Sequence, residues 1–208
     1  MASRSLFRAV TLVLFVFVPW LLFSCGKSDA KLESNNLSSS YTTTSGTTSV
    51  EGGDVVKIQL TSSAFKNGEK IPSKYTGDGE NVSPPLAWQG APQGTKSFAL
   101  ICDDPDAPVG TWVHWVIFNV PANTTELKEG IPATKELPDG TRQGLNDFLK
   151  VGYGGPAPPP GKPHRYFFRL YALDCVLNLK AECKKSELVK AMQGHILGSG
   201  ELVGIYQR

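Results

Sequence analysis

This sequence has no sustained run of basic residues. Its 208 residues include 21 lysines and arginines against 19 aspartates and glutamates. Arg4 and Arg8 lie in a segment that we expect to be removed, and without them the two signs balance. Because proteins that bind the nucleic-acid backbone usually carry a basic stripe or patch, we predict no nucleic-acid partner.

The common signatures of hydrolytic catalysis are also missing. The sequence contains neither the G-x-S-x-G turn that presents a nucleophilic serine nor the H-E-x-x-H zinc motif. Ser83 is the one hydroxyl in a suggestive position, and the two prolines after it favour a rigid corner. We therefore predict that the chain is not an enzyme, with no catalytic residue and no cofactor. A hydrolase that uses Asp104, His114 and His164 as a metal site or an acid–base pair is the least favoured alternative.

Cysteine is scarce, with four residues in the chain and no pair at C-x-x-C spacing. We therefore predict no metal site. Cys102 lies in a β-prone run and is expected to be an inert core residue. Cys175 and Cys183 enclose the short segment VLNLKAE, and we predict a disulfide between them in an oxidising compartment. Two free thiols are the alternative.

The longest apolar run, residues 9–23, is short for a membrane span and contains Pro19. With two arginines before it, residues 1–24 read as a secretory signal peptide. Leu22-Phe23-Ser24-Cys25 resembles a bacterial lipobox, which predicts that Cys25 is lipidated and becomes the first mature residue. An uncleaved signal anchor is the alternative. Gly26 and Lys27 follow, without the aspartate of an inner-membrane retention signal, so we expect a lipid anchor in the outer membrane, facing the periplasm.

Three segments divide the chain. Residues 1–24 are the signal peptide, and residues 25–53 are a lipidated N-terminus with a Ser- and Thr-rich tether that cannot bury enough apolar surface to order itself. Residues 54–208 have the composition of a folded, mainly β domain.

Strands are predicted where apolar residues alternate or β-prone residues cluster: 55–60, 86–88, 97–103, 112–120, 164–173 and 201–206. Alternation in the fourth of these places His114 on one strand face with Trp112, Val116 and Phe118. Asp103, just after the third, is expected to be a turn acid.

One helix is predicted near the end of the chain. Ser186 is its expected N-cap, Leu188, Val189 and Met192 form its apolar stripe, and residues 195–197 continue it.

Several motifs in the folded region occur together in a fixed order. They are Ser83-Pro84-Pro85-Leu86-x-Trp88, Asp104-Pro105-Asp106-Ala107-Pro108, Trp112-Val113-His114-Trp115, Gly154-Gly155-Pro156, His164-Arg165-Tyr166 and Gly200-Glu201-Leu202-Val203-Gly204. This set resembles the phosphatidylethanolamine-binding protein family, and more closely its bacterial Raf-kinase-inhibitor-like branch. The resemblance spans residues 55–208.

The resemblance implies a central antiparallel sheet packed on a smaller one, and a small cavity that takes phosphate or a phospholipid headgroup. Carried over by residue, the ligand-binding set is Asp104, Asp106, Pro108, His114, Gly155, Pro156, His164 and Tyr166. Imidazole and phenol can donate to a phosphate, and a carboxylate beside an imidazole can fix its tautomer or raise its pKa. We expect ligand affinity to fall as pH rises through neutrality.

The first functional hypothesis is thus a membrane-tethered module that binds a small anion and regulates a protein partner. The alternative is a peptidase inhibitor acting through an exposed loop, for which residues 155–163 are the candidate.

Overall fold

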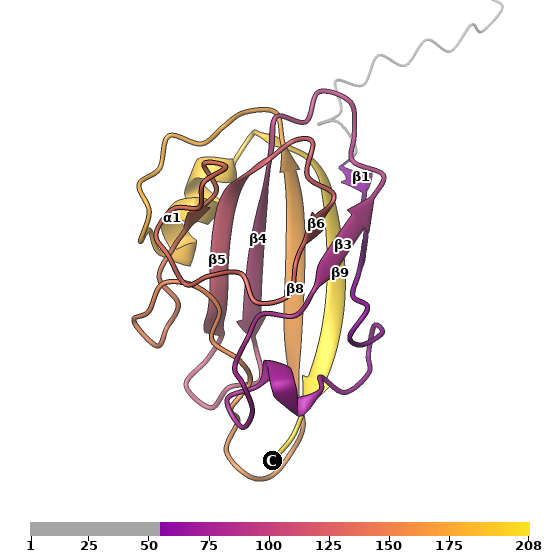
Figure 1. Cartoon of the computed structure of the whole chain (residues 1–208), viewed down its shortest axis with the longest axis vertical. Helices are drawn as coiled ribbons and strands as arrows, with labels where there is room; N and C mark the ends of the chain where they lie inside the picture. The colour runs from indigo at the N-terminus through magenta and orange to yellow at the C-terminus, as the bar shows by residue number, and fades with distance from the viewer. Residues whose placement is uncertain (1–54) are drawn as a thin grey trace, which may run out of the picture. The chain divides into compact units, whose positions relative to one another are not determined.

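Two β-sheets form the framework of residues 55–208, the part of the chain that the computed structural model describes (Figure 1). The predicted signal peptide, Cys25 and the tether lie outside these residues. The larger sheet has the strand order β1 (Val56–Lys57), β9 (Ile196–Tyr206), β8 (His164–Leu173), β4 (Ser97–Asp104), β5 (Trp112–Pro121) and β7 (Arg142–Gln143). The smaller sheet has the order β2 (Gln59–Thr61), β3 (Leu86–Gln89) and β6 (Glu126–Leu127).

All neighbouring strands are antiparallel except β1, which runs parallel to β9. The predicted fold class, a mainly β protein with a central sheet packed on a smaller one, is confirmed. The central sheet is mixed rather than purely antiparallel, because β1 adds a parallel strand at its edge.

Apolar side chains cover both faces of the larger sheet, as expected for a sheet buried between two layers. On one face a large core, which includes Phe98, Trp115 and Phe168, packs against Leu60 and Trp88 of the smaller sheet. On the other face a second core joins the sheet to α1 (Lys185–Met192). Figure 1 shows α1 beside β5, away from the smaller sheet.

The long strands follow the predicted ranges closely, whereas the predicted helix is too long. The observed helix α1 ends at Met192, and Ile196 and Leu197 already belong to β9. Gly194, with φ of +79°, turns the chain between them, a conformation that glycine adopts without strain. The expected cap at Ser186 is wrong by two residues, because the N–H of Lys184 donates to the carboxylate of Glu187 at 2.7 Å.

A short 3-10 turn, η1 (Ser73–Tyr75), precedes the loop before β3. Among residues 55–208 there is no helix long and apolar enough to cross a membrane.

The predicted disulfide is not formed, and Cys175 and Cys183 are free thiols. Cys183 packs in the second core, and burial raises the pKa of its thiol to about 11. The sulfur of Cys175 lies instead within 4.8 Å of ligand atoms of Asp174 and His195. Cys102 is buried in the first core, as predicted.

A β-bulge interrupts the alternation of β5. Trp115 pairs with Cys102, but Val113 pairs with Asp103, so His114 is an extra residue without a partner on β4. Val113 consequently packs in the second core together with Val116 and Phe118. The predicted shared face of His114, Val116 and Phe118 is therefore wrong, since a bulge redirects the side chains on either side of it.

Candidate functional site

Three long strands bring polar side chains to one end of the larger sheet. Asp104 ends β4, His114 lies near the start of β5, and His164 and Tyr166 begin β8. All four side chains are at least nine-tenths buried, and all four line a cavity of about 200 Å³. Pro108, from the loop between β4 and β5, lines it as well. Five of the eight predicted ligand-binding residues thus meet at one cavity.

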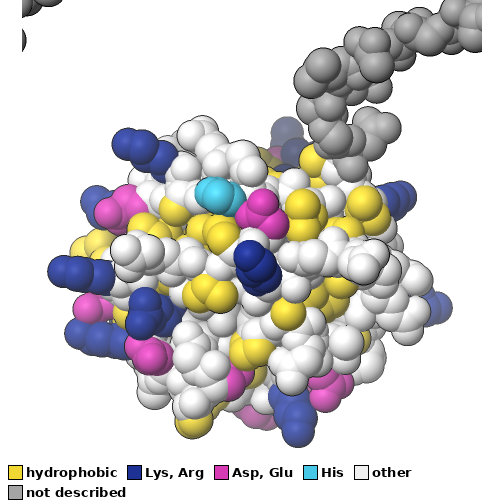
Figure 2. All heavy atoms as spheres, turned by 90° about the horizontal axis from the view of Figure 1, so that it is seen from above, with side chains coloured by type: hydrophobic (Ala, Val, Ile, Leu, Met, Phe, Trp, Pro, Cys, Tyr) yellow, Lys and Arg dark blue, Asp and Glu magenta, His cyan; other side chains and the backbone are white. Residues whose placement is uncertain are grey.

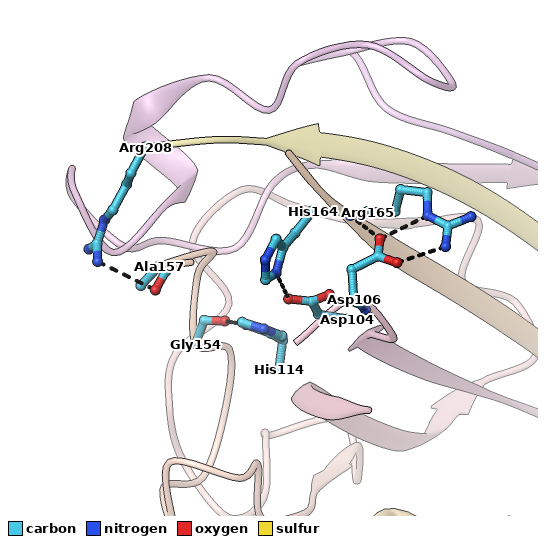
Figure 3. A network of polar contacts seen from close by, with 8 residues as sticks. All are labelled: Asp104, Asp106, His114, Gly154, Ala157, His164, Arg165 and Arg208. Carbon is cyan, nitrogen blue, oxygen red and sulfur yellow. Dashed lines mark hydrogen bonds and ion pairs between the residues drawn. The ribbon is translucent and has the colours of Figure 1, made fainter. Parts of the chain in front are cut away.

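His164 and Asp104 form a buried pair. The imidazole Nδ1 lies 2.7 Å from Oδ2 of the carboxylate, and the other carboxylate oxygen accepts the backbone N–H of Asp106 at 2.8 Å. Because Asp104 accepts at Nδ1, that nitrogen carries a proton, and Nε2 is the ring nitrogen left to meet a ligand. Figure 3 shows the His164 ring directed at this carboxylate.

His114 is held by the backbone of Gly154. Its Nδ1 donates to the Gly154 carbonyl at 2.5 Å, while the Gly154 N–H donates to the His114 carbonyl at 2.8 Å (Figure 3). Burial lowers the pKa of this imidazole below its ordinary value, and the Gly154 carbonyl and nearby carboxylates offset only part of that effect. His114 is therefore neutral at pH 7 in the unliganded protein, with Nε2 as an acceptor.

Tyr166 contributes a hydroxyl that has no hydrogen-bond partner within residues 55–208. The residue is only 1% exposed, and its ring meets that of His114 edge to face at 5.1 Å. Burial, and next the Asp104 carboxylate, raise the pKa of the phenol. The group is thus a permanent O–H donor. A buried donor left without a partner costs about 1–3 kcal/mol, so this hydroxyl marks a position for a ligand acceptor.

Asp106 does not line the cavity. Its carboxylate makes a two-pronged ion pair with Arg165, with both contacts at 2.8 Å, and also accepts the Arg165 backbone N–H at 3.0 Å. The arginine lowers the pKa of Asp106 to about 2. Figure 3 shows this pair pointing away from the two histidines. Asp106 therefore fastens the loop after β4 to β8, and we assign it a positioning role.

Gly155 and Pro156 support the cavity from behind and do not form its wall. The Gly155 N–H, expected to face an anion, donates to the side-chain oxygen of Asn81 at 2.7 Å, and the Pro156 carbonyl accepts the N–H of Gly77 at 2.8 Å. The next residues, Ala157, Pro158 and Pro159, line the cavity instead. The Gly155 N–H is thus used by the loop at 77–81, and contact of the Gly155–Pro156 backbone with a ligand stays a prediction.

Two aromatic residues of the cavity escaped the sequence analysis. Phe148 stands edge-on to His114 at 5.5 Å and to Trp112 at 5.4 Å, and both aromatic residues line the cavity. Trp112 occurs in a quoted motif, but no local pattern distinguishes Phe148. It reaches the site because Asp147 is fixed to Val113 of β5 by two hydrogen bonds, at 2.7 and 2.9 Å.

Both imidazole Nδ1 atoms of the cavity are engaged by oxygen acceptors, which leaves Nε2 as the free nitrogen of each ring. Within the described region, the one group of three side chains with ligand atoms close enough to share an ion is Asp174, Cys175 and His195, which lies elsewhere. The cavity offers the Tyr166 hydroxyl and two imidazole Nε2 atoms in a mainly apolar surrounding.

Known proteins resemble this chain over the region that forms both sheets. Residues 61–207 match the family model described as phosphatidylethanolamine-binding protein. A "UPF0098 protein" of Methanothermobacter thermautotrophicus is 55% identical over 151 residues, which cover 73% of this chain and 99% of that protein. The crystal structure of a phosphatidylethanolamine-binding protein homologue from Chlamydia trachomatis matches with a TM-score of 0.67 and 40% identity, covering 73% of this chain and 98% of the other.

Escherichia coli YbcL, solved as a member of the mammalian PEBP family, matches with a TM-score of 0.68 and 35% identity over 74% of this chain and 99% of its own. Both solved chains consist almost wholly of the matching region, so in those two proteins the region folds without a segment equivalent to residues 1–53. The order of the motifs, the two-sheet fold and these matches agree: the chain belongs to the phosphatidylethanolamine-binding protein family.

Proposed function

We propose that this chain is a membrane-tethered binding module whose cavity holds a small phosphate-bearing anion, free or as a headgroup. The observation that carries the proposal is the Tyr166 hydroxyl, which is buried, unpartnered in the described region and placed beside two imidazoles. An anion oxygen at this point would satisfy the hydroxyl and remove its desolvation cost.

The two histidines supply complementary groups. Asp104 holds a proton on Nδ1 of His164, so Nε2 of that ring is the nitrogen that would meet a phosphate oxygen or hydroxyl. Nε2 of neutral His114 would accept a proton from a phosphate hydroxyl, or would donate after protonation. Both Asp104 oxygens are already engaged by protein groups, so this carboxylate orients His164 rather than contacting the anion.

The size and walls of the cavity favour a headgroup over a whole lipid. Its volume of about 200 Å³ is below the range of about 300–1,000 Å³ typical of sites for drug-sized ligands. Pro108, Trp112 and Phe148 give it an apolar rim against which a short methylene stem can pack. Acyl chains would remain outside.

The loop considered for peptidase inhibition is part of this cavity. Gly155, Pro156 and Pro158 are buried, and exposed residues begin only at Pro159. Ala157, Pro158 and Pro159 line the cavity wall. This arrangement favours ligand binding as the role of the loop. Regulation of a protein partner and an outer-membrane location facing the periplasm remain part of the proposal, supported by the lipobox-like sequence before Cys25.

Calorimetric titration of residues 54–208 with phosphate and with phosphoethanolamine tests the proposal. We expect saturable binding to the parent, and Tyr166→Phe should weaken it about 10- to 100-fold, the loss expected for one hydrogen bond to a charged group. Tyr171→Phe, also on β8 but outside the cavity, is the matched control and should bind normally. A folded parent that binds neither anion would refute the proposal.

A further inference from the structure

A second cluster of chemically competent side chains lies at the opposite end of the larger sheet. Asp174 and Cys175 directly follow β8, and His195 directly precedes β9, so the pairing of these strands brings all three together. Their ligand atoms, a carboxylate oxygen, a thiol sulfur and an imidazole nitrogen, all lie within 4.8 Å of one another. We propose that Asp174, Cys175 and His195 bind a Zn²⁺ ion.

The backbone under the cluster is fixed by three hydrogen bonds. The Asp174 N–H donates to the His195 carbonyl at 3.0 Å, and the His195 N–H donates to the Met192 carbonyl at 3.0 Å. The Cys175 carbonyl accepts the hydroxyl of buried Ser97 at 2.6 Å. The three Cα positions are therefore set before any ion arrives, and only side-chain rotation is needed to complete the site.

The donor set selects the ion. Thiolate sulfur with imidazole nitrogen suits borderline and soft ions, whereas Mg²⁺ and Ca²⁺ prefer oxygen ligands. Zn²⁺ binds sulfur at about 2.3 Å and nitrogen at about 2.0 Å, and ligand atoms within 4.8 Å of one another can reach a tetrahedron with these bonds by side-chain rotation. His195 Nδ1 and Asp174 Oδ1 now share a hydrogen bond of 2.8 Å, which must open slightly to admit the ion. Binding releases the Cys175 thiol proton and any proton on His195 Nδ1 to solvent, and three protein ligands leave the fourth position to water.

The cluster is accessible from solvent. The side chains of His195 and Asp174 are 46% and 44% exposed, and Cys175 is half-buried. Figure 2, which views the molecule from the upper end of Figure 1, shows a histidine beside an acidic side chain on this surface. The site could not be predicted from the sequence, because Cys175 and His195 are far apart in the chain and become neighbours only through the β8–β9 pairing.

An ion here would join the end of β8 to the start of β9. The site is independent of the anion cavity, which lies at the start of β8, so either proposal can fail alone. Since an ion that binds only the folded state stabilises it, Zn²⁺ should raise the melting temperature.

The test uses residues 54–208, reduced and freed of metal, titrated with Zn²⁺ by calorimetry. We expect one equivalent to bind, and Cys175→Ala and His195→Ala each to weaken binding by at least about tenfold. Cys183→Ala removes a thiol outside the cluster and is the matched control, expected to bind normally. With Co²⁺ as a probe, the parent and the control should show a thiolate-to-metal charge-transfer band that Cys175→Ala lacks.

Thermal melts separate ligand loss from misfolding. Zn²⁺ should raise the melting temperature of the parent and of Cys183→Ala but not that of Cys175→Ala. No saturable binding by the parent would overturn the proposal. Equal binding by Cys175→Ala would also overturn it, because the ion would then occupy another site, such as the two buried histidines.

Discussion

Replacing Tyr166 with Phe removes one buried hydroxyl that lacks a partner in residues 55–208 and leaves the ring in place. Because an unsatisfied buried polar group costs about 1–3 kcal/mol, we expect Tyr166→Phe to increase the free energy of unfolding of the unliganded protein by about 1 kcal/mol. Urea denaturation measures this change. The control Tyr153→Phe, whose hydroxyl donates to the Tyr75 carbonyl at 2.8 Å, should decrease stability. A destabilised Tyr166→Phe would mean that the hydroxyl is satisfied in solution.

His114 makes stability depend on pH. Its pKa in the folded protein lies below the ordinary value of 6.5, so the unfolded chain binds the extra proton first as pH falls. The contribution of neutral His114 to the free energy of unfolding is therefore complete above about pH 6.5. It is lost as the pH falls through the pKa that His114 has in the folded protein. We expect the stability difference between the parent and His114→Gln to shrink in urea titrations between pH 7 and pH 5. A constant difference would contradict the buried, neutral imidazole.

The lowered pKa of His114 also changes the pH range in which ligand affinity should vary. If an anion favours protonated His114, affinity must rise as pH falls, but chiefly below pH 6.5 rather than through neutrality as the sequence suggested. Sulfate is a useful probe because, unlike phosphate, it does not titrate in this range. We expect calorimetric sulfate affinity to rise from pH 7 to pH 5 in the parent and to rise less in His114→Gln. Identical profiles for the two proteins would exclude His114 as a donor.

The residues that line the cavity were easier to predict than the side chains with which buried residues pair. The set Asp104, His114, His164 and Tyr166 meets at the cavity as the motif resemblance implied. Asp103, expected to be a turn acid, is instead buried at the end of β4 and paired with Arg169 and Lys185. Such partners lie many residues away in the chain, so local sequence carries no information about them.

At the scale of elements, the β-bulge in β5 explains why the strand was predicted but its faces were not. Hydrophobic alternation requires that every residue on β5 pairs with one on β4, and His114 breaks that rule. The bulge turns His114 toward Tyr166 and lets Gly154 bond to both its backbone and its ring. No residue type marks a bulge of this kind, so its position could not be read from the sequence.

The loop that supports the cavity needs a glycine at position 155 because the space is tight, not because φ is positive. A Cβ added to Gly155 would lie 2.6 Å from the Tyr75 carbonyl oxygen and 2.8 Å from the Thr76 Cα, both backbone atoms. We expect Gly155→Ala to lower the free energy of unfolding by about 2–3 kcal/mol, the upper part of the range for overpacking, and to weaken anion binding by displacing Ala157–Pro159. Urea denaturation and calorimetry measure the two effects.

Gly140→Ala is the control for this loop. Gly140 has φ of +86° but open space around its Cβ position, so only the backbone conformation costs energy, about 1 kcal/mol. Anion binding by this variant should be unchanged. If Gly155→Ala is no less stable than Gly140→Ala, the loop is free to move and does not hold the cavity wall in place.

For the whole molecule, the sequence predicted the class of fold and the long strands but not the strand order. The strands β4, β5 and β8 carry clear apolar patterns, whereas β1, β6 and β7 have two residues each and are defined by their partners. The parallel pairing of β1 with the start of β9 places the beginning of the described chain at the end of the sheet opposite the cavity.

This separation gives the last prediction, which concerns the proposed anchor. Cys25→Ser removes the thiol that a lipobox requires and leaves every residue of the folded region unchanged. We expect the variant to move from the membrane fraction to the soluble fraction of the cell envelope, while its calorimetric affinity for phosphoethanolamine stays equal to that of residues 54–208. Ser24→Ala, which keeps Cys25, is the control and should remain in the membrane fraction. A Cys25→Ser protein that stays membrane-bound would favour an uncleaved signal anchor, because residues 9–23 alone would then hold the protein in the bilayer.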